Sequence, residues 1–153
     1  MDDASPAGPD GQEKQARRFA VECARLLSDD KCGHVVVLDV RGLSQVTDYL
    51  VIGSGTSDRQ MLSALDHARE LGDTMDHPCL RTSADDRATW VLADFADVVV
   101  HLFEPATREH YDLEMLWGDA ERLMWRRPGD NGAAAADAGE ADAGRADTGD
   151  APP

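Results

Sequence analysis

Apolar residues in this chain gather into short runs that are typical of β-strands. The run His34–Val40 is rich in valine and predicts an inner strand, because β-branched residues fit the buried surface of a sheet. Tyr49–Gly53 predicts the next strand, after a loop around Gly42. Two further runs, Thr89–Phe95 and Asp97–Phe103, predict an antiparallel hairpin. Two strand pairs of this kind indicate a small sheet.

Apolar residues at helical spacing mark two longer segments. Gln12–Ser28 carries one apolar stripe and predicts a helix. Ser57 and Gln60 fit a capping box, which predicts a second helix that continues to about Leu71. We expect this second helix to bury Met61, Leu62, Leu65 and Ala68.

The remaining elements follow from proline, glycine and short apolar segments. Pro105 predicts the start of a third helix and Gly118 its end. Asp119–Arg127 predicts a last helical stretch, and Cys79–Arg81 a short edge strand. The inward face of the third helix is expected to carry Ala106, His110, Leu113 and Trp117.

The turn of the hairpin decides which residues face each other across its strands. If Phe95–Ala96 is a two-residue loop, Asp94 lies opposite Asp97 and Trp90 lies opposite His101. Two facing carboxylates indicate surrounding water or a cation brought by a partner. Alternation then gives one face with Val91, Ala93, Val98 and Val100 and another with Trp90, Leu92, Val99 and His101.

The first of these faces is small and apolar, so a helix can pack closely on it. The second face carries an aromatic residue beside acids and has two readings. It is either a protein-binding patch or a second buried face in which Trp90 belongs to the core, and the pattern leaves both open.

Length and composition predict one folded domain over residues 12–127. Segments 1–11 and 128–153 hold no large apolar side chain beyond Met1, and we expect both to be disordered. The formal net charge is −15, of which −7 falls within residues 12–127. No basic cluster suited to phosphate contacts is present, so the composition favours a basic protein partner over direct contact with RNA.

Targeting and redox signals indicate a cytoplasmic protein. The three cysteines are an odd number without close spacing, which is typical of reduced thiols. No apolar stretch approaches membrane-spanning length, and the early acidic residues argue against a transit peptide. We therefore expect no membrane attachment.

Few residue patterns indicate catalysis. The turn Gly53–Thr56 could cradle a phosphate at a helix N-terminus, but it lacks the lysine of a phosphate-binding loop, and capping alone explains it. The loop Asp76–Cys79 offers metal-ligand types with no second cluster. We expect no catalytic residue, no cofactor and no metal.

Three segments together resemble the ribosomal silencing factor family, also called the Iojap family. They are Leu38–Gln60, Trp90–Phe103 and Arg108–Ala120, and they span the predicted core in order. The resemblance implies an α/β fold with a mixed sheet of about five strands flanked by helices. This fold is similar to a nucleotidyltransferase core without its catalytic carboxylates.

The resemblance also implies a function. Family members bind the large ribosomal subunit through its ribosomal protein fourteen and block joining of the small subunit, which lowers translation when nutrients are limiting. Trp90 matches a tryptophan in the family's ribosome-binding region. On this basis the expected partner-binding residues are Trp90, Leu92, Asp94, Asp97, Val99, His101, Tyr111 and Trp117.

The sequence departs from the usual family pattern at two places, and three other possibilities stay open beside translational silencing. Ala96 stands where the family usually has glycine, which puts the hairpin register in question, and Thr82–Ala88 lacks the family's usual Glu-Gly before the tryptophan. Assembly of the large subunit would use the same patch, so the sequence does not separate it from silencing. A nucleotide-binding transferase is the third hypothesis. A homodimer away from the ribosome is also left open.

Overall fold

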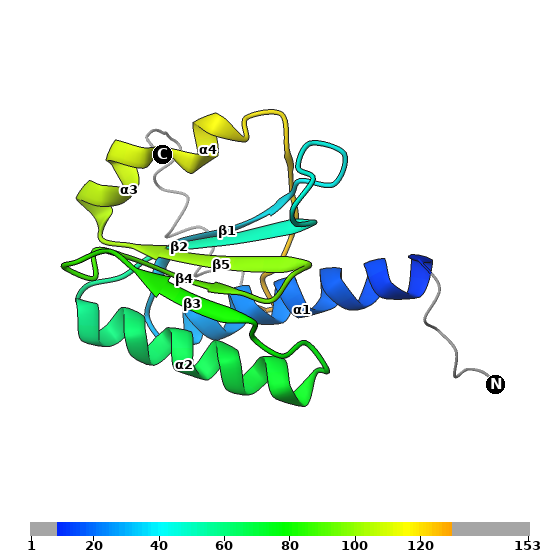
Figure 1. Cartoon of the computed structure of the whole chain (residues 1–153), viewed down its shortest axis with the longest axis horizontal. Helices are drawn as coiled ribbons and strands as arrows, with labels where there is room; N and C mark the ends of the chain where they lie inside the picture. The colour runs from blue at the N-terminus through cyan, green and yellow to red at the C-terminus, as the bar shows by residue number, and fades with distance from the viewer. Residues whose placement is uncertain (1–8, 130–153) are drawn as a thin grey trace.

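A six-stranded mixed sheet forms the centre of the molecule, and its strands lie in the order β3-β4-β5-β2-β1-β6 (Figure 1). The computed structural model describes residues 9–129, so most of the predicted disordered segments 1–11 and 128–153 lies outside the described residues. Residues 9–11 were predicted to be disordered and instead begin the first helix, three residues before its predicted start at Gln12. β2 and β5 are parallel, and the other neighbouring strands are antiparallel. The strands are β1 (Gly33–Asp39), β2 (Tyr49–Ser54), β3 (Arg81–Ala84), β4 (Trp90–Asp94), β5 (Val98–Phe103) and β6 (Glu121–Arg122).

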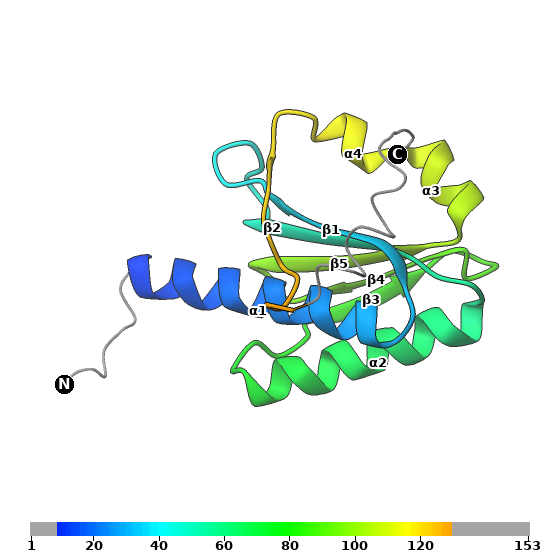
Figure 2. The ribbon, with the colours of Figure 1, turned by 180° about the vertical axis from the view of Figure 1, so that it is seen from behind.

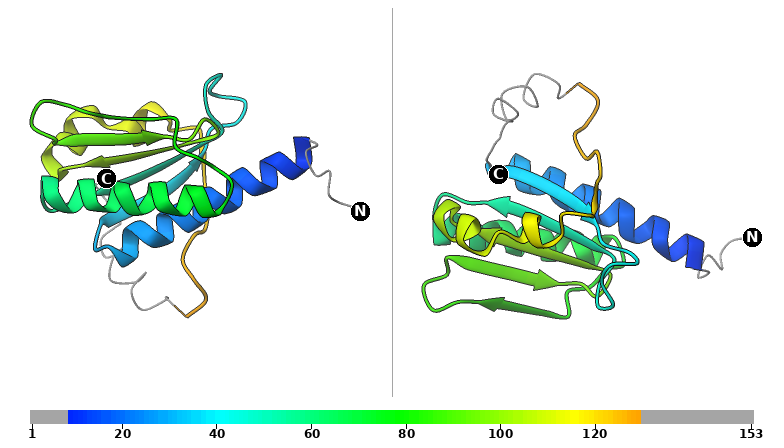
Figure 3. Two further views of the ribbon diagram at one scale, coloured as in Figure 1. Left: turned by 60° about the horizontal axis from the view of Figure 1, so that its bottom comes forward. Right: turned by 90° about the horizontal axis from the view of Figure 1, so that it is seen from above.

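Helices lie over both faces of this sheet. The two long ones, α1 (Pro9–Asp29) and α2 (Asp58–Thr74), cover one face, and the first turns of α1 project beyond the strands (Figure 2). The two short ones, α3 (Pro105–Tyr111) and α4 (Leu113–Leu116), lie across the other face, as the two views of Figure 3 show. The predicted α/β class with a mixed sheet is therefore confirmed, and β6 adds a sixth strand.

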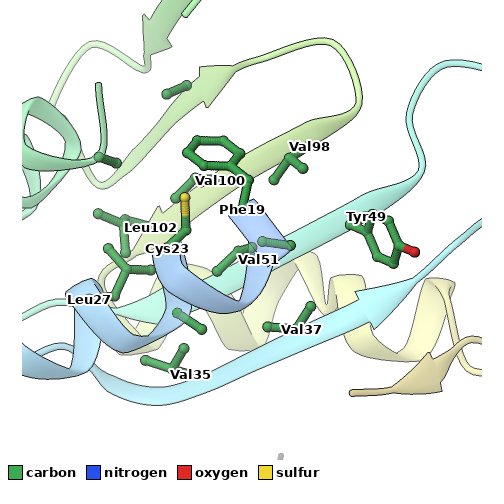
Figure 4. Close-up of a cluster of buried hydrophobic side chains, with 14 of the residues drawn as sticks. Phe19, Cys23, Leu27, Val35, Val37, Tyr49, Val51, Val98, Val100 and Leu102 are labelled. Carbon is green, nitrogen blue, oxygen red and sulfur yellow. The ribbon is translucent and has the colours of Figure 1, made fainter. Parts of the chain in front are cut away.

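The face under α1 and α2 holds the main core. Phe19, Cys23 and Leu27 of α1 lie over the valines of the central strands (Figure 4). Phe19 also meets the edge of Phe95, with ring centroids 4.9 Å apart. Burial raises the pKa of the Cys23 thiol, so this cysteine acts as a small apolar packing residue.

A smaller apolar cluster lies on the opposite face. Its buried members are Leu38, Val40, Leu50, Ile52 and Phe103. Leu113 and Trp117 pack against it from the region of α4. Because β1, β2 and β5 are thus covered on both sides, they are nearly continuous apolar runs, as expected for the inner strands of such a sheet.

The β4–β5 turn comes one residue later than the sequence predicted. Trp90 pairs with Phe103 and Asp94 with Val99, so the predicted pairings of Trp90 with His101 and of Asp94 with Asp97 are wrong. The N–H of Phe95 donates to the carbonyl of Val98 at 2.8 Å, which leaves Ala96 and Asp97 as the turn residues.

Ala96 explains why the register was hard to predict. It adopts a φ of +75°, a conformation that glycine enters more easily than alanine. The register moved by two residues, and an even shift leaves every side chain on its predicted face. Val91, Ala93, Val98 and Val100 are accordingly buried under the helices, whereas Trp90, Leu92, Val99 and His101 lie half-buried on the other face.

The third helix begins at Pro105, as predicted, but Asp112 adopts a left-handed conformation (φ 47°, ψ 56°) and divides it into α3 and α4. Leu113 and Trp117 pack inward as predicted, whereas Ala106 and His110 are exposed. The last predicted helix is wrong. Residues 119–127 are not helical. Leu123 and Trp125 are buried while Met124 is 83 % exposed, an alternation typical of extended chain. The N–H of Leu123 donates to the carbonyl of Val37 at 2.9 Å, which continues the pairing begun by β6.

Two smaller predictions need adjustment. The edge strand begins at Arg81, where the prediction had it end. Leu62 of α2 is 44 % exposed, and Ala64 is buried in its place. The other predicted buried residues of α2, Met61, Leu65 and Ala68, are confirmed.

Candidate partner-binding surface

Five of the six predicted site residues on the hairpin share one face of the sheet, and the sixth, Asp97, lies in the turn. Alternation places Trp90, Leu92 and Asp94 of β4 on this face, beside Val99 and His101 of β5. All five are half-buried. We call this set the Trp90 face. Its aromatic end lies where β4 begins, and its acidic end lies about 13 Å away at the turn.

Trp90 is held on three sides and still reaches solvent. Its indole N–H donates to Nδ1 of His101 at 3.1 Å. Its ring lies 5.2 Å from the ring of Phe103 and 4.6 Å from that of Tyr111, centroid to centroid. The reading of a covered face therefore holds in part, because α3 covers Trp90 through Tyr111 and the indole is half-buried. The reading of a protein-binding patch stays a prediction.

His101 acts as a neutral acceptor in this arrangement. Burial lowers its pKa from 6.5 to about 4, so the imidazole carries no charge at neutral pH. Because Nδ1 accepts the indole N–H, the remaining proton lies on Nε2. The contact fixes the orientation of the indole and occupies its single donor.

Asp85 positions the main chain of Trp90, a role that sequence reasoning missed. A carboxylate oxygen of Asp85 accepts from the N–H of Thr89 at 2.7 Å and from that of Trp90 at 3.1 Å. The Thr89 hydroxyl also donates to this carboxylate, and this bond is the main reason that the pKa of Asp85 is lowered. The polar segment before the tryptophan was the available signal, since aspartate often binds nearby backbone N–H groups in turns.

The acidic end pairs different residues from those predicted. Asp94 forms an exposed ion pair with Arg81, with Nε and Oδ2 3.2 Å apart. The carbonyl of Asp97 accepts the N–H groups of Asp48 and Tyr49, each at 3.0 Å. Burial, followed by the charge of Asp97, raises the pKa of Asp48. The close acidic pair is therefore Asp48 with Asp97, at the end of the sheet where parallel strands β2 and β5 begin.

The short helices add apolar surface beside the Trp90 face. Tyr111 is 48 % exposed even though it contacts Trp90, and Met115 and Leu116 are 76 % and 69 % exposed. Sequence reasoning missed Met115 and Leu116. Trp117, in contrast, packs on the smaller apolar cluster and is half-buried.

The glycine-rich turn uses its own N–H groups internally. The N–H of Gly55 donates to the carbonyl of Phe103 at 2.9 Å, and that of Thr56 donates to Oε1 of Gln60. Ser57 Oγ accepts the N–H of Gln60 at 3.1 Å, as the predicted cap requires. These donors are not directed at a common anion position, which weakens the nucleotide-binding hypothesis.

The loop with metal-ligand types has a packing role. The ring of His77 stacks on Phe19 at a centroid distance of 4.8 Å. Within residues 9–129, His, Cys, Asp and Glu side chains form no group of three or more that could hold a metal ion. None of the helices in that range is long and apolar enough to cross a membrane.

Comparison with known proteins finds a family model and several related proteins. Residues 13–150 match the family model described as ribosomal silencing factor during starvation. A ribosomal silencing factor of Bacillus subtilis is 40 % identical over 100 residues, covering 63 % of this chain and 82 % of that protein. The mouse protein named mitochondrial assembly of ribosomal large subunit protein 1 is 34 % identical over 60 % of this chain and 42 % of its own length.

Solved structures agree with this match. A Chromobacterium violaceum protein superposes with a TM-score of 0.61 at 26 % identity, covering 75 % of this chain and 92 % of that protein. A Bacillus halodurans protein superposes with a TM-score of 0.58 at 29 % identity, covering 72 % and 98 %.

Proposed function

This chain belongs to the ribosomal silencing factor family, and we propose that it represses translation by binding the large ribosomal subunit through the Trp90 face. The bound protein would then occupy the surface that the small subunit needs. The observation that carries the proposal is the half-exposed Trp90, fixed in orientation by His101 and Tyr111 on an acidic molecule.

The chemistry of the surface indicates the class of partner. An aromatic anchor with apolar neighbours and an acidic end suits a protein surface that offers an apolar patch beside basic side chains. We propose ribosomal protein fourteen of the large subunit as that partner, as the resemblance to the family implies. A net charge of −15 opposes close contact with RNA phosphates, so we propose that protein contacts dominate.

We further propose that the protein acts by occlusion in the cytoplasm and not as an enzyme. The turn that could have bound a phosphate donates its N–H groups within the chain. Occlusion needs only affinity and bulk, and a rigid domain with an anchored aromatic residue supplies both.

Assembly of the large subunit is the second candidate function. The name of the mouse relative supports this function, because it refers to mitochondrial assembly of the ribosomal large subunit. Both functions use the same surface, so loss of binding does not separate them. Accumulation of immature large subunits in cells that lack the protein would favour assembly, whereas normal subunits that join too readily would favour silencing.

Pelleting with separated ribosomal subunits tests the proposal. The wild-type protein should sediment with large subunits and not with joined ribosomes. Trp90→Ala should lose most of this binding, because truncation of an interface aromatic commonly costs about 2 kcal/mol or more. Leu62→Ala is the matched control, since it truncates an exposed apolar residue of α2 on the opposite face. Equal binding by both variants would reject the Trp90 face.

A further inference from the structure

Helix α3 carries Tyr111 to the Trp90 face, yet the helix itself is weakly buried. It has seven residues, all of them described, and none is buried. A helix this short is unstable alone and depends on tertiary contacts. The position of Tyr111 therefore depends on side chains that tie α3 to the sheet.

Arg108 provides such a tie. Its Nη1 donates to Oγ of Ser54 at 2.8 Å. Ser54 is the last residue of β2, is 6 % exposed and pairs with Phe103, the last residue of β5. The hydrogen bond thus joins α3 to the point where the two parallel central strands end. A charged donor and a nearly buried acceptor make this a strong contact.

The chain leaves α3 at Asp112, directly after Tyr111. The N–H of Asp112 donates to the carbonyl of Arg108 at 2.8 Å, and Asp112 caps α4 by accepting the N–H of Met115 at 3.2 Å. Arg108 and Tyr111 are three residues apart, so their side chains lie on the same side of α3. Because the bond to Ser54 holds this side of α3 against the sheet, it also restrains the position of Tyr111.

We propose that Arg108 is a positioning residue of the partner-binding surface, whose hydrogen bond to Ser54 holds Tyr111 against Trp90. This inference rests on the proposed function of the Trp90 face. It assigns the glycine-rich turn a role in anchoring α3. Arg108 acts through Tyr111 and does not itself contact the partner.

The sign of the electrostatic effect separates the positioning role of Arg108 from the simple loss of its positive charge. The inferred partner is basic, so removal of a positive charge from this acidic protein should strengthen binding slightly. Arg69→Gln measures that baseline, because Arg69 lies on α2, on the opposite face, with its side chain 53 % exposed. A loss of affinity in Arg108→Gln would therefore have the opposite sign to the charge effect.

The test is a double-mutant cycle with Ser54→Ala, Arg108→Gln and the double variant, alongside Arg69→Gln and Trp90→Ala. Affinity for isolated large subunits is measured together with the indole ¹H–¹⁵N resonance of Trp90 in the free protein, below each melting temperature. We expect each single variant to weaken binding about fivefold and to shift the Trp90 resonance, since each breaks the same hydrogen bond. The affinity of the double variant should be no lower than that of the single variant that binds less tightly.

Four outcomes overturn the inference. Additive losses in the cycle, or a loss in Arg108→Gln with normal binding by Ser54→Ala, would show that Arg108 contacts the partner directly. Wild-type affinity in both single variants, with Trp90→Ala weakened, would remove the role of Arg108 and leave the proposed function intact. Undiminished binding by Trp90→Ala would instead show that the Trp90 face itself is not the binding surface.

Discussion

Trp90 and His101 are diagonal neighbours on strands β4 and β5, and the indole N–H of Trp90 donates to Nδ1 of His101 at 3.1 Å. The bond links the aromatic anchor to an inner strand of the sheet. A partner bound to this face would therefore meet the ring of Trp90 and not its N–H group.

Trp90→Phe should retain much more affinity than Trp90→Ala. Phenylalanine keeps an aromatic ring against Tyr111, although it has one ring fewer than the indole and lacks the N–H that His101 accepts. We expect a loss of about 1 kcal/mol for phenylalanine and about 2 kcal/mol or more for alanine. Titration calorimetry with the isolated ribosomal partner measures both. Equal losses would indicate that the partner uses the indole N–H.

His101 should make the protein less stable in mild acid. Its pKa is depressed in the folded state, so between pH 6.5 and about 4 the unfolded chain binds a proton that the folded protein refuses. The free energy of unfolding should fall over this window by about 2 kcal/mol more in the wild type than in His101→Asn.

Denaturant titrations at pH 6.5 and at about pH 4 measure the free energy of unfolding of both proteins and give this difference. His67, whose pKa Asp30 raises, titrates in both proteins and cancels in the comparison. An identical pH dependence in wild type and variant would mean that the pKa of His101 is the same in the folded protein as in the unfolded chain.

Ala96→Gly should stabilise the protein. Ala96 is at φ +75°, where a Cβ atom is unfavourable and glycine is not. We expect a gain of about 0.5–1 kcal/mol in the free energy of unfolding, after the greater freedom of glycine in the unfolded chain is subtracted. Ala93→Gly, in the buried middle of β4, is the control and should be destabilising. A destabilised Ala96→Gly would show that the turn is not as described.

Salt should weaken partner binding only moderately. The surface combines apolar contacts with a few acidic groups, so we expect affinity to fall less than about tenfold between 50 and 200 mM salt, against about a thousandfold or more for a protein with many phosphate contacts. Binding curves at four salt concentrations measure the slope. A slope as steep as that of a phosphate-binding protein would contradict the dominance of protein contacts.

The sequence predicted the elements whose signals are local. Ser57 and Gln60 marked the start of α2, and the alternation in β4 and β5 separated the buried face from the Trp90 face. Residues 119–127 misled because Leu123, Met124 and Trp125 are consecutive apolar residues, and so short a run shows neither the helical nor the strand period.

Other features depend on the folded structure and could not be predicted from the sequence. Asp48 and Asp97 are distant in sequence and meet because β2 and β5 run parallel from the same end of the sheet. Arg108 reaches Ser54 because α3 returns across the strand ends. The register of the hairpin depended on whether alanine would adopt a positive φ, and composition alone does not decide that.

Subunit joining provides the most direct test of the central claim. Light scattering reports association when small subunits are mixed with large subunits saturated by the wild-type protein, by Trp90→Ala at the same concentration, or by none. The account predicts that the wild type suppresses joining and that Trp90→Ala does not. Small subunits that join saturated large subunits as readily as bare ones would contradict it.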